Sequence, residues 1–196
     1  MADILVLDAD GVTNPLRFSD FSRYGLSGAD AAAFFNGPFK ECCLIGADTR
    51  QELLRFAAER GLQLDLDGLF AHWHRDQRDT YAKVITAVTL LRQAGVHAVL
   101  ATNQDPYRLE YMRTDMQYGD FFDQIFCSSE MGVIKPDPLF FLQIQSVLPA
   151  GTIRYIDDHQ ENVETARAAC AWESHCLQGE QAVTEQLRAW WPEVFR

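Results

Sequence analysis

The stretch Ile4-Leu5-Val6-Leu7-Asp8-Ala9-Asp10-Gly11 decides the fold of this chain. A run of apolar residues that ends in a polar turn is typical of a strand buried on both faces of a parallel sheet. The turn places Asp8 and Asp10 at the carboxyl end of that strand, where open α/β sheets bind ligands. Two neighbouring carboxylates indicate a divalent cation, because their mutual repulsion needs a positive partner. A plain turn is the competing interpretation, since Asp and Gly are common turn residues.

The composition is that of a soluble globular protein. The 196 residues are 47% hydrophobic and 23% charged, enough for one substantial core with a modest insert. The formal net charge of −11, without a cluster of Lys and Arg, argues against a broad nucleic-acid surface. No apolar segment is long enough to span a bilayer, so we expect no membrane partner. Nothing in the pattern indicates an oligomeric state.

The five cysteines and the first residues indicate a reducing, cytoplasmic setting. Their odd number, without a Cys-x-x-Cys pair, disfavours a disulfide framework and a zinc site. We expect most of them to be buried as small apolar residues. The N-terminus lacks the basic and then apolar segments of a secretory signal. We therefore expect a cytoplasmic protein.

The residues after the first turn have helical patterns and lack a convincing buried strand. Helices are expected over Ala29–Phe35, Thr49–Arg60 and Leu66–Arg75, separated by Gly37-Pro38, Gly46 and Gly61. In the second of these helices, one face would carry Leu53, Leu54, Phe56 and Ala57. The pattern predicts a small helical insert, a cap domain of residues 15–79.

From Thr80 onward, helical and strand patterns alternate regularly. The expected helices are Tyr81–Gln93, Tyr107–Met116, Leu139–Val147, Asn162–Ala171 and Ala182–Trp191. The expected strands are Val96–Ala101, Gln124–Cys127, Thr152–Ile156 and Trp172–Cys176. This alternation predicts an α/β fold, a Rossmann-like parallel sheet core flanked by helices, with a small α-helical cap inserted after the first strand. Residues 1–14 and 80–196 would form the core domain.

Polar residues follow each of the expected buried strands. Thr102 and Asn103 follow the second strand, a Lys135-Pro136 pair follows the third, and Asp157-Asp158 with Asn162 follows the fourth. Each alone has an ordinary explanation as a turn, a surface lysine or a helix cap. Because the carboxyl ends of parallel strands share one edge, the four groups together indicate a single site.

These four groups resemble the four motifs of the haloacid dehalogenase-like superfamily, in order and in spacing. They are Asp8-Ala9-Asp10-Gly11-Val12, Thr102-Asn103, Lys135-Pro136, and Asp157-Asp158 with Asn162. The insert resembles the cap found at that place in many members. The Phe34-Phe35 pair, the short cap and the run from Asp157 to Val163 are similar to the N-terminal phosphatase domain of soluble epoxide hydrolases and to bacterial sugar-phosphate phosphatases.

The resemblance implies a Mg²⁺-dependent phosphatase that hydrolyses a small phosphorylated metabolite, such as a sugar phosphate, through an aspartyl-phosphate. Asp8 would be the nucleophile and Asp10 the general acid and then base. Thr102, Asn103 and Lys135 would bind the phosphoryl group, with Thr102 and Lys135 also taking part in catalysis.

The resemblance also implies a metal site. Magnesium would be held by Asp8, by the backbone carbonyl of Asp10 and by Asp158, with waters completing its oxygen ligands. Asp157 would act through water, and Asn162 would orient the ligands. An acid at Asp10 favours phosphate esters over the organohalides of the dehalogenase branch, whose halide leaving group needs no proton.

Two alternatives stay open. A mutase that moves phosphate between sugar hydroxyls would keep the same acid, although the usual mutase cap is larger. A non-catalytic phosphate-binding module would keep the fold, although every catalytic position is filled here. The residues that could face substrate from the cap are Phe18, Tyr24, Phe34, Phe35, Lys40 and His72-Trp73-His74-Arg75. Most are expected to form the core of the insert, and Trp190 and Trp191 are expected to pack on the sheet domain or a partner.

Overall fold

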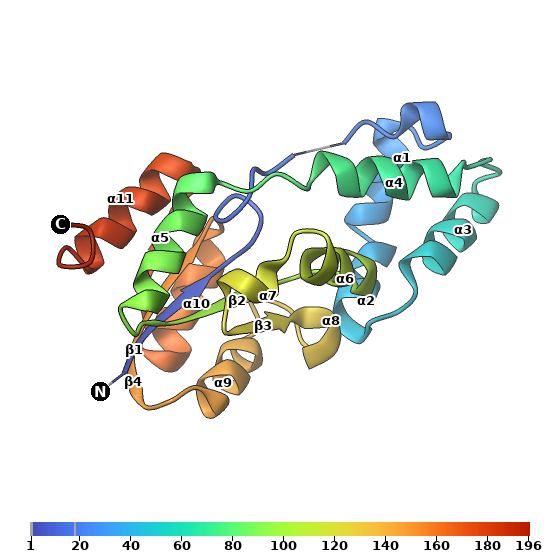
Figure 1. Ribbon diagram of the computed structural model, residues 1–196. Coiled ribbons are helices and arrows are strands. Elements are labelled where there is room, and N and C mark those ends of the chain that lie inside the picture. The colour runs from blue at the N-terminus through green and yellow to red at the C-terminus, as the bar shows by residue number, and fades with distance from the viewer. Residues whose placement is uncertain (1, 18) are drawn as a thin grey trace.

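A five-stranded parallel sheet forms the centre of the computed structural model, which describes residues 2–17 and 19–196 (Figure 1). The order of strands across the sheet is β3-β2-β1-β4-β5, and every neighbouring pair is parallel. The strands are β1 Ala2–Leu7, β2 His97–Thr102, β3 Gln124–Cys127, β4 Gly151–Asp157 and β5 Glu173–Cys176. The Rossmann-like α/β fold with a helical insert after the first strand is confirmed.

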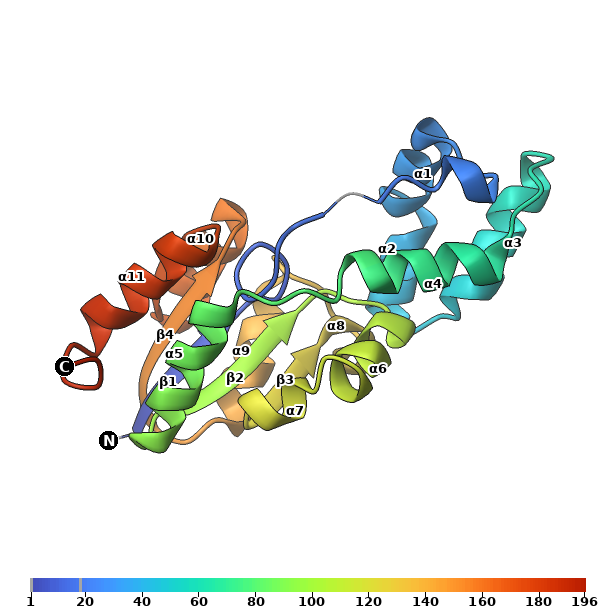
Figure 2. The ribbon, with the colours of Figure 1, turned by 45° about the horizontal axis from the view of Figure 1, so that its top comes forward.

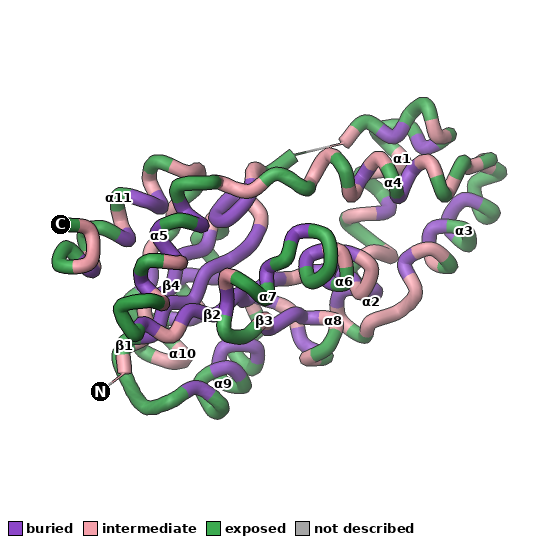
Figure 3. Tube along the Cα trace, viewed as in Figure 1, coloured by how far each residue is buried: buried purple, intermediate pink, exposed green. Residues whose placement is uncertain are grey.

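Strand β1 lies at the middle of the sheet and is covered on both faces. Leu5 and Leu7 face one hydrophobic cluster, which includes α5 (Ala82–Gln93) and α11 (Glu180–Trp190). Ile4 and Val6 face a second cluster with α9 (Pro138–Val147) and α10 (Gln160–Cys170). This two-sided burial is the reason for the uninterrupted apolar run. Figure 3 shows the same concentration of buried residues along the strands.

The remaining core helices are short or begin at an Asp-Pro pair. They are α6 (Pro106–Thr114), α7 (Tyr118–Phe121) and α8 (Ser128–Met131). The Asp105 carboxylate caps α6, and the Asp137 carboxylate caps α9. Each helix therefore starts one residue earlier than expected, because proline fits the first helical position, whose N–H has no helical partner.

The insert consists of the 3-10 helix η1 (Ser22–Tyr24) and the helices α1 (Gly28–Phe35), α2 (Pro38–Ile45), α3 (Thr49–Glu59) and α4 (Leu66–Asp76). It lies beyond the carboxyl ends of β2 and β3, on the side to which their arrows point (Figure 2). It has a hydrophobic cluster of its own. The buried members of that cluster are Phe21, Leu26, Phe34, Leu53, Phe56, Leu69, Phe70 and Trp73.

Two expectations for the insert were wrong. Helix α2 was not expected, because Gly37-Pro38 and Gly46 were interpreted only as breaks. Pro38 instead begins the helix and Gly46 ends it with a left-handed backbone, a proline-to-glycine pattern that itself marks a helix. Leu54 is 51% exposed and is not part of the buried face of α3, which consists of Thr49, Leu53, Phe56 and Ala57.

The structure also tests the expectations for the cysteines, the C-terminal tryptophans and membrane-spanning segments. Cys42, Cys43 and Cys127 are buried, whereas Cys170 is half-buried and Cys176 is exposed, and all five are free thiols. The Trp191 ring is buried in the cluster beneath α5 and α11, as expected of a side chain that packs on the sheet domain. Among the described residues, no helix has both the length and the apolar character to cross a membrane.

Candidate active site

The loop after β1 presents Asp8 and Asp10 at the carboxyl edge of the sheet. It curls tightly around the carbonyl oxygen of Ala9, which accepts hydrogen bonds from the backbone N–H groups of residues 12–14 at 2.7–3.2 Å. Gly11 has a φ of +80°, a backbone conformation that glycine adopts without steric cost. The curl places the two carboxylates in different surroundings, which separates their chemistry.

Lys135 lies between two of the acids. Its ammonium is 2.8 Å from Asp8 Oδ1 and 2.6 Å from Asp157 Oδ2, and it donates to the carbonyl of Ala101 at 2.9 Å. The lysine side chain is 1% exposed. The alternative interpretation of Lys135 as a surface lysine is therefore wrong. Its ammonium connects the loop after the third strand to the ends of the first and fourth strands.

The residues at the end of β2 hold the loop that carries Lys135 in place. The Asn103 amide donates to the carbonyl of Lys135 and accepts from its backbone N–H, both at 2.9 Å. Thr102 ends β2 and is buried. Asn103 thus lies at the site, as expected, and it also holds the main chain of Lys135, a role that the sequence did not indicate.

Asp157 is fully buried and accepts several hydrogen bonds. Its donors are the Lys135 ammonium, the Tyr155 hydroxyl, the backbone N–H of His159 at 2.8 Å and the Asn162 amide at 2.9 Å. Tyr155 was not among the expected site residues. The period-2 alternation of a strand places positions 155 and 157 on the same face of β4, and that pattern could have indicated it.

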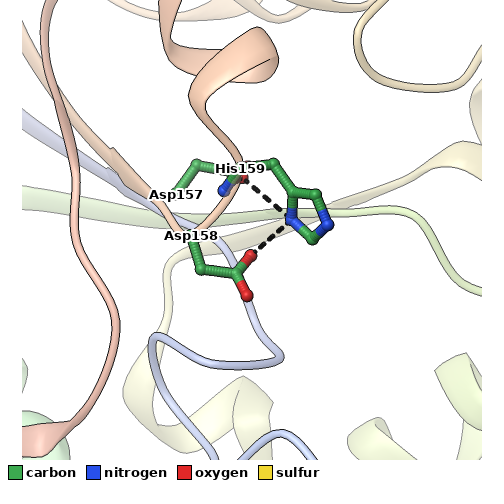
Figure 4. Close-up of side chains that lie close together, drawn as sticks. All are labelled: Asp157, Asp158 and His159. Atoms are coloured by element: carbon green, nitrogen blue, oxygen red, sulfur yellow. Dashed lines mark hydrogen bonds and ion pairs between the residues drawn. The ribbon is translucent and has the colours of Figure 1, made fainter.

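Asp158 lies next to Asp157 and directs its carboxylate toward the ring of His159 (Figure 4). Its Oδ1 is 2.6 Å from Nδ1 of His159, whose side chain is 70% exposed. Its Oδ2 faces the first loop so closely that a Cβ atom built on Gly11 would lie 2.5 Å from it. The potential ligand atoms of Asp157, Asp158 and His159 all lie within 4.8 Å of one another. His159 was not expected from the sequence.

The electrostatics of the cluster favour added positive charge. Burial raises the pKa of Asp8, the nearby Lys135 opposes that rise, and Asp157 adds to it. Burial alone would raise the pKa of Asp157 too, but Lys135 and the hydrogen bonds hold it below its usual value. Burial also raises the pKa of Asp158. Three carboxylates thus lie close to one buried ammonium, which contacts only Asp8 and Asp157, an arrangement that suits a divalent cation.

Asp10 is held apart from this cluster by two amides. Its Oδ2 accepts from Nε2 of Gln104 at 2.7 Å, and its Oδ1 accepts from Nδ2 of Asn14. Gln104 is buried, and its backbone N–H donates to the Ser128 hydroxyl at 3.1 Å. Sequence reasoning missed both amides, although Gln104 directly follows the Thr102-Asn103 pair at the end of β2.

A cavity of about 520 Å³ opens between these loops and the cap. Asp10, Asn103 and Gln104 line it from the core, and Phe35 and Trp73 line it from the cap. Other cap candidates lie elsewhere. Phe34 is buried in the cap cluster, Tyr24 and His72 pack on each other, and Lys40, His74 and Arg75 do not line the cavity. Phe18 lies outside the described residues.

Comparison with curated proteins finds phosphatases of bacteria. A phosphoglycolate phosphatase of Pseudomonas syringae pv. tomato is 31% identical over 114 residues, covering 57% of this chain and 41% of that protein. A phosphoglycolate phosphatase of Pseudomonas savastanoi pv. phaseolicola is 30% identical over the same shares. The chain thus spans about two fifths of the length of these relatives.

Comparison with solved structures finds the same fold in HAD family enzymes. One from Bacteroides thetaiotaomicron, in complex with magnesium, has a TM-score of 0.79 at 17% identity and covers 95% of this chain and 98% of its own. The same enzyme with magnesium and inorganic phosphate has a TM-score of 0.71 at 17% identity, with 89% and 93% covered. A HAD-like family hydrolase from Porphyromonas gingivalis has a TM-score of 0.78 at 22% identity, with 97% and 98% covered.

Comparison with models of protein families also finds a match. The model described as haloacid dehalogenase-like hydrolase matches residues 24–169, about three quarters of the chain. On that match, this chain belongs to the haloacid dehalogenase-like hydrolases.

Proposed function

We propose that this chain is a Mg²⁺-dependent phosphatase that hydrolyses a small phosphate monoester through an aspartyl-phosphate on Asp8. The observation that carries the proposal is that the two acids of one loop have different partners. Asp8 is paired with the Lys135 ammonium at 2.8 Å, whereas Asp10 is held by the amides of Gln104 and Asn14 and lines the cavity.

The two acids are proposed to act in two successive steps. In the first step an oxygen of Asp8 forms a bond to phosphorus, the ester P–O bond breaks, and Asp10 gives its proton to the departing alcohol oxygen. In the second step Asp10 takes a proton from water, the water oxygen bonds to phosphorus, and the acyl phosphate bond breaks. Inorganic phosphate leaves and the Asp8 carboxylate is restored.

Lys135 supplies fixed positive charge to this reaction. Burial alone would lower the pKa of its ammonium, but the carboxylates of Asp157 and Asp8 raise it above the ordinary lysine value. The ammonium therefore stays charged at neutral pH. A buried charge that needs no reorganisation is the form of stabilisation on which phosphoryl transfer depends. Thr102 and the second N–H of the Asn103 amide are proposed to bind the phosphoryl oxygens.

The donor set fits magnesium. Asp8 and Asp158 offer carboxylate oxygens, the Asp10 carbonyl offers a third oxygen, and Gly11 leaves room beside Asp158 that any side chain would fill. Bound magnesium would neutralise the crowded acids, keep Asp8 ionised and polarise the phosphoryl group. Asp157, already bonded to Lys135, Tyr155 and Asn162, is proposed to orient these groups rather than bind the metal.

The relatives support this proposal. The names of the curated relatives describe phosphatases, and the Bacteroides enzyme of the same fold has been solved with magnesium and inorganic phosphate. A small phosphorylated metabolite is therefore the proposed substrate, and 2-phosphoglycolate is one compound to test.

The test is release of inorganic phosphate from p-nitrophenyl phosphate, with and without Mg²⁺. We expect activity with Mg²⁺, none in EDTA, and none with Asp8→Asn. Activity that survives EDTA and Asp8→Asn would contradict the mechanism. A mutase would return the phosphoryl group to a second hydroxyl instead of to water, so sugar phosphates should be assayed for both free phosphate and isomerised ester.

A further inference from the structure

The cap side of the cavity is predominantly apolar. Four aromatic side chains, Phe21, Phe35, Phe39 and Trp73, line it from the cap. They pack edge to face and at tilted angles, with ring centroids 5.1–6.1 Å apart. Gly28, Ala31 and Ala32 of α1 complete this apolar wall.

Much of the polar lining is already engaged within the protein. The amide of Gln104 is bonded to Asp10, and the amide of Asn103 is bonded to the main chain of Lys135. Arg17 is the lining cation among the described residues, and its guanidinium is 2.8 Å from Asp79 Oδ2. A carboxylate placed against the cap wall would therefore lose water without gaining an unpaired cation.

We infer that the cap cavity selects phosphate monoesters of apolar, ring-sized alcohols over esters that carry a second anionic group. This inference rests on the proposed phosphatase function and deepens it by naming the substrate class. A cavity of about 520 Å³ holds far more than a two-carbon acid, and aromatic walls reward a flat apolar group through burial and edge-to-face contact. The hydroxyl of Ser19, buried and without a partner among the described residues, can accept or donate one hydrogen bond to a substituent.

The experiment compares three esters of primary alcohols: benzyl phosphate, ethyl phosphate and 2-phosphoglycolate. We expect kcat/KM for benzyl phosphate to exceed that for ethyl phosphate at least ~10-fold, because a pocket discriminates by about that factor for even one methylene. The preference over 2-phosphoglycolate should be larger, because the carboxylate also loses its hydration. A higher kcat/KM for 2-phosphoglycolate than for benzyl phosphate would overturn the inference while leaving the phosphatase function intact.

A pair of variants on one helix tests the wall directly. Ala32→Arg adds a cation at a position that lines the cavity, so it should shift the ratio of kcat/KM toward 2-phosphoglycolate at least ~10-fold. Ala33→Arg is the matched control, because Ala33 is exposed on the same helix and does not line the cavity. Equal shifts in both variants, or none in Ala32→Arg, would count against the apolar wall as the selector.

A binding measurement separates the inference from turnover. Calorimetry on Asp8→Asn with Mg²⁺ should detect tighter binding of benzylphosphonate than of phosphonoacetate, which places a carboxylate where the other has a ring. Failure of every ester to release phosphate would refute the proposed function, while this binding preference would still decide whether the cavity favours apolar groups. Equal or reversed affinities would refute the inference.

Discussion

Replacing Lys135 by Met tests the buried ion-pair network on which the candidate site depends. Methionine keeps the length and apolar stem of the side chain but removes the ammonium that lies 2.8 Å from Asp8 and 2.6 Å from Asp157. Two carboxylates then remain buried at one strand edge without their shared counterion. The variant should lose both activity and stability.

The size of the stability loss follows from the burial. The lysine side chain is 1% exposed, and removing one partner of a buried pair costs about 3–5 kcal/mol because the other charge is left uncompensated. For a chain of this size each kcal/mol corresponds to about 2–4 °C in Tm, so Tm should fall by ~6–20 °C. A second change, Asp8→Asn, should cost less in this background than in the native protein, because its charge is already unpaired.

Urea unfolding in EDTA, at pH 5 and pH 8, measures the effect without a bound cation. The loss of unfolding free energy should be greater at pH 8 than at pH 5. At pH 5 the unpaired carboxylates of the folded variant can take up a proton, which neutralises their charge. This stabilising protonation is lost as the pH rises. Lys83→Met is the matched control: that lysine side chain is 75% exposed, and we expect a change below about 0.5 kcal/mol. A loss for Lys135→Met under about 1 kcal/mol, or one that does not depend on pH, would refute the reasoning.

Three further predictions concern other contacts. Gln104→Leu removes the donor to Asp10, so kcat/KM should fall by ~10- to 100-fold for an alkyl phosphate and less for p-nitrophenyl phosphate, whose leaving group needs little protonation. Gly11→Ala crowds Asp158 Oδ2, so the Mg²⁺ concentration for half-maximal activity should rise by ~10-fold or more. Burial, with Arg108 nearby, lowers the pKa of His74 to about 4. The folded protein therefore binds fewer protons than the unfolded chain between pH 6.5 and 4, and stability falls as pH drops through that range. His74→Phe should reduce that fall by about 1 kcal/mol, allowing for screening at a partly exposed site.

Each of these predictions has an outcome against it. Equal losses on alkyl and aryl phosphates with Gln104→Leu would mean that the amide supports the fold and not proton transfer. An unchanged Mg²⁺ requirement in Gly11→Ala would remove Asp158 from the metal site. Urea unfolding of His74→Phe that tracks the native protein from pH 7 to pH 4.5 would show that this histidine titrates normally.

The expected site came from local pattern combined with one topological rule. Asp8 lies more than 100 residues before Lys135 and Asp157 in the chain, yet the structure brings the Lys135 ammonium within hydrogen-bond distance of both carboxylates. Parallel strands all end at the same edge, so polar residues placed after several strands must meet there. The partners of Asp10 could not be derived in this way, because Gln104 reaches it only through the particular loop that follows β2.

The sequence by itself determined the sheet and the helical insert and indicated the residues that are proposed to react, because strand burial and turn chemistry depend on short stretches such as 4–11. Only the tertiary structure decided what each carboxylate contacts. Asp157 is enclosed by Tyr155, Lys135 and Asn162, whereas Asp158 faces Gly11 and His159. The tertiary structure also decided which residues line the cavity. That lining depends on how the insert packs over the strand ends, and this packing brings together residues that are far apart in the sequence.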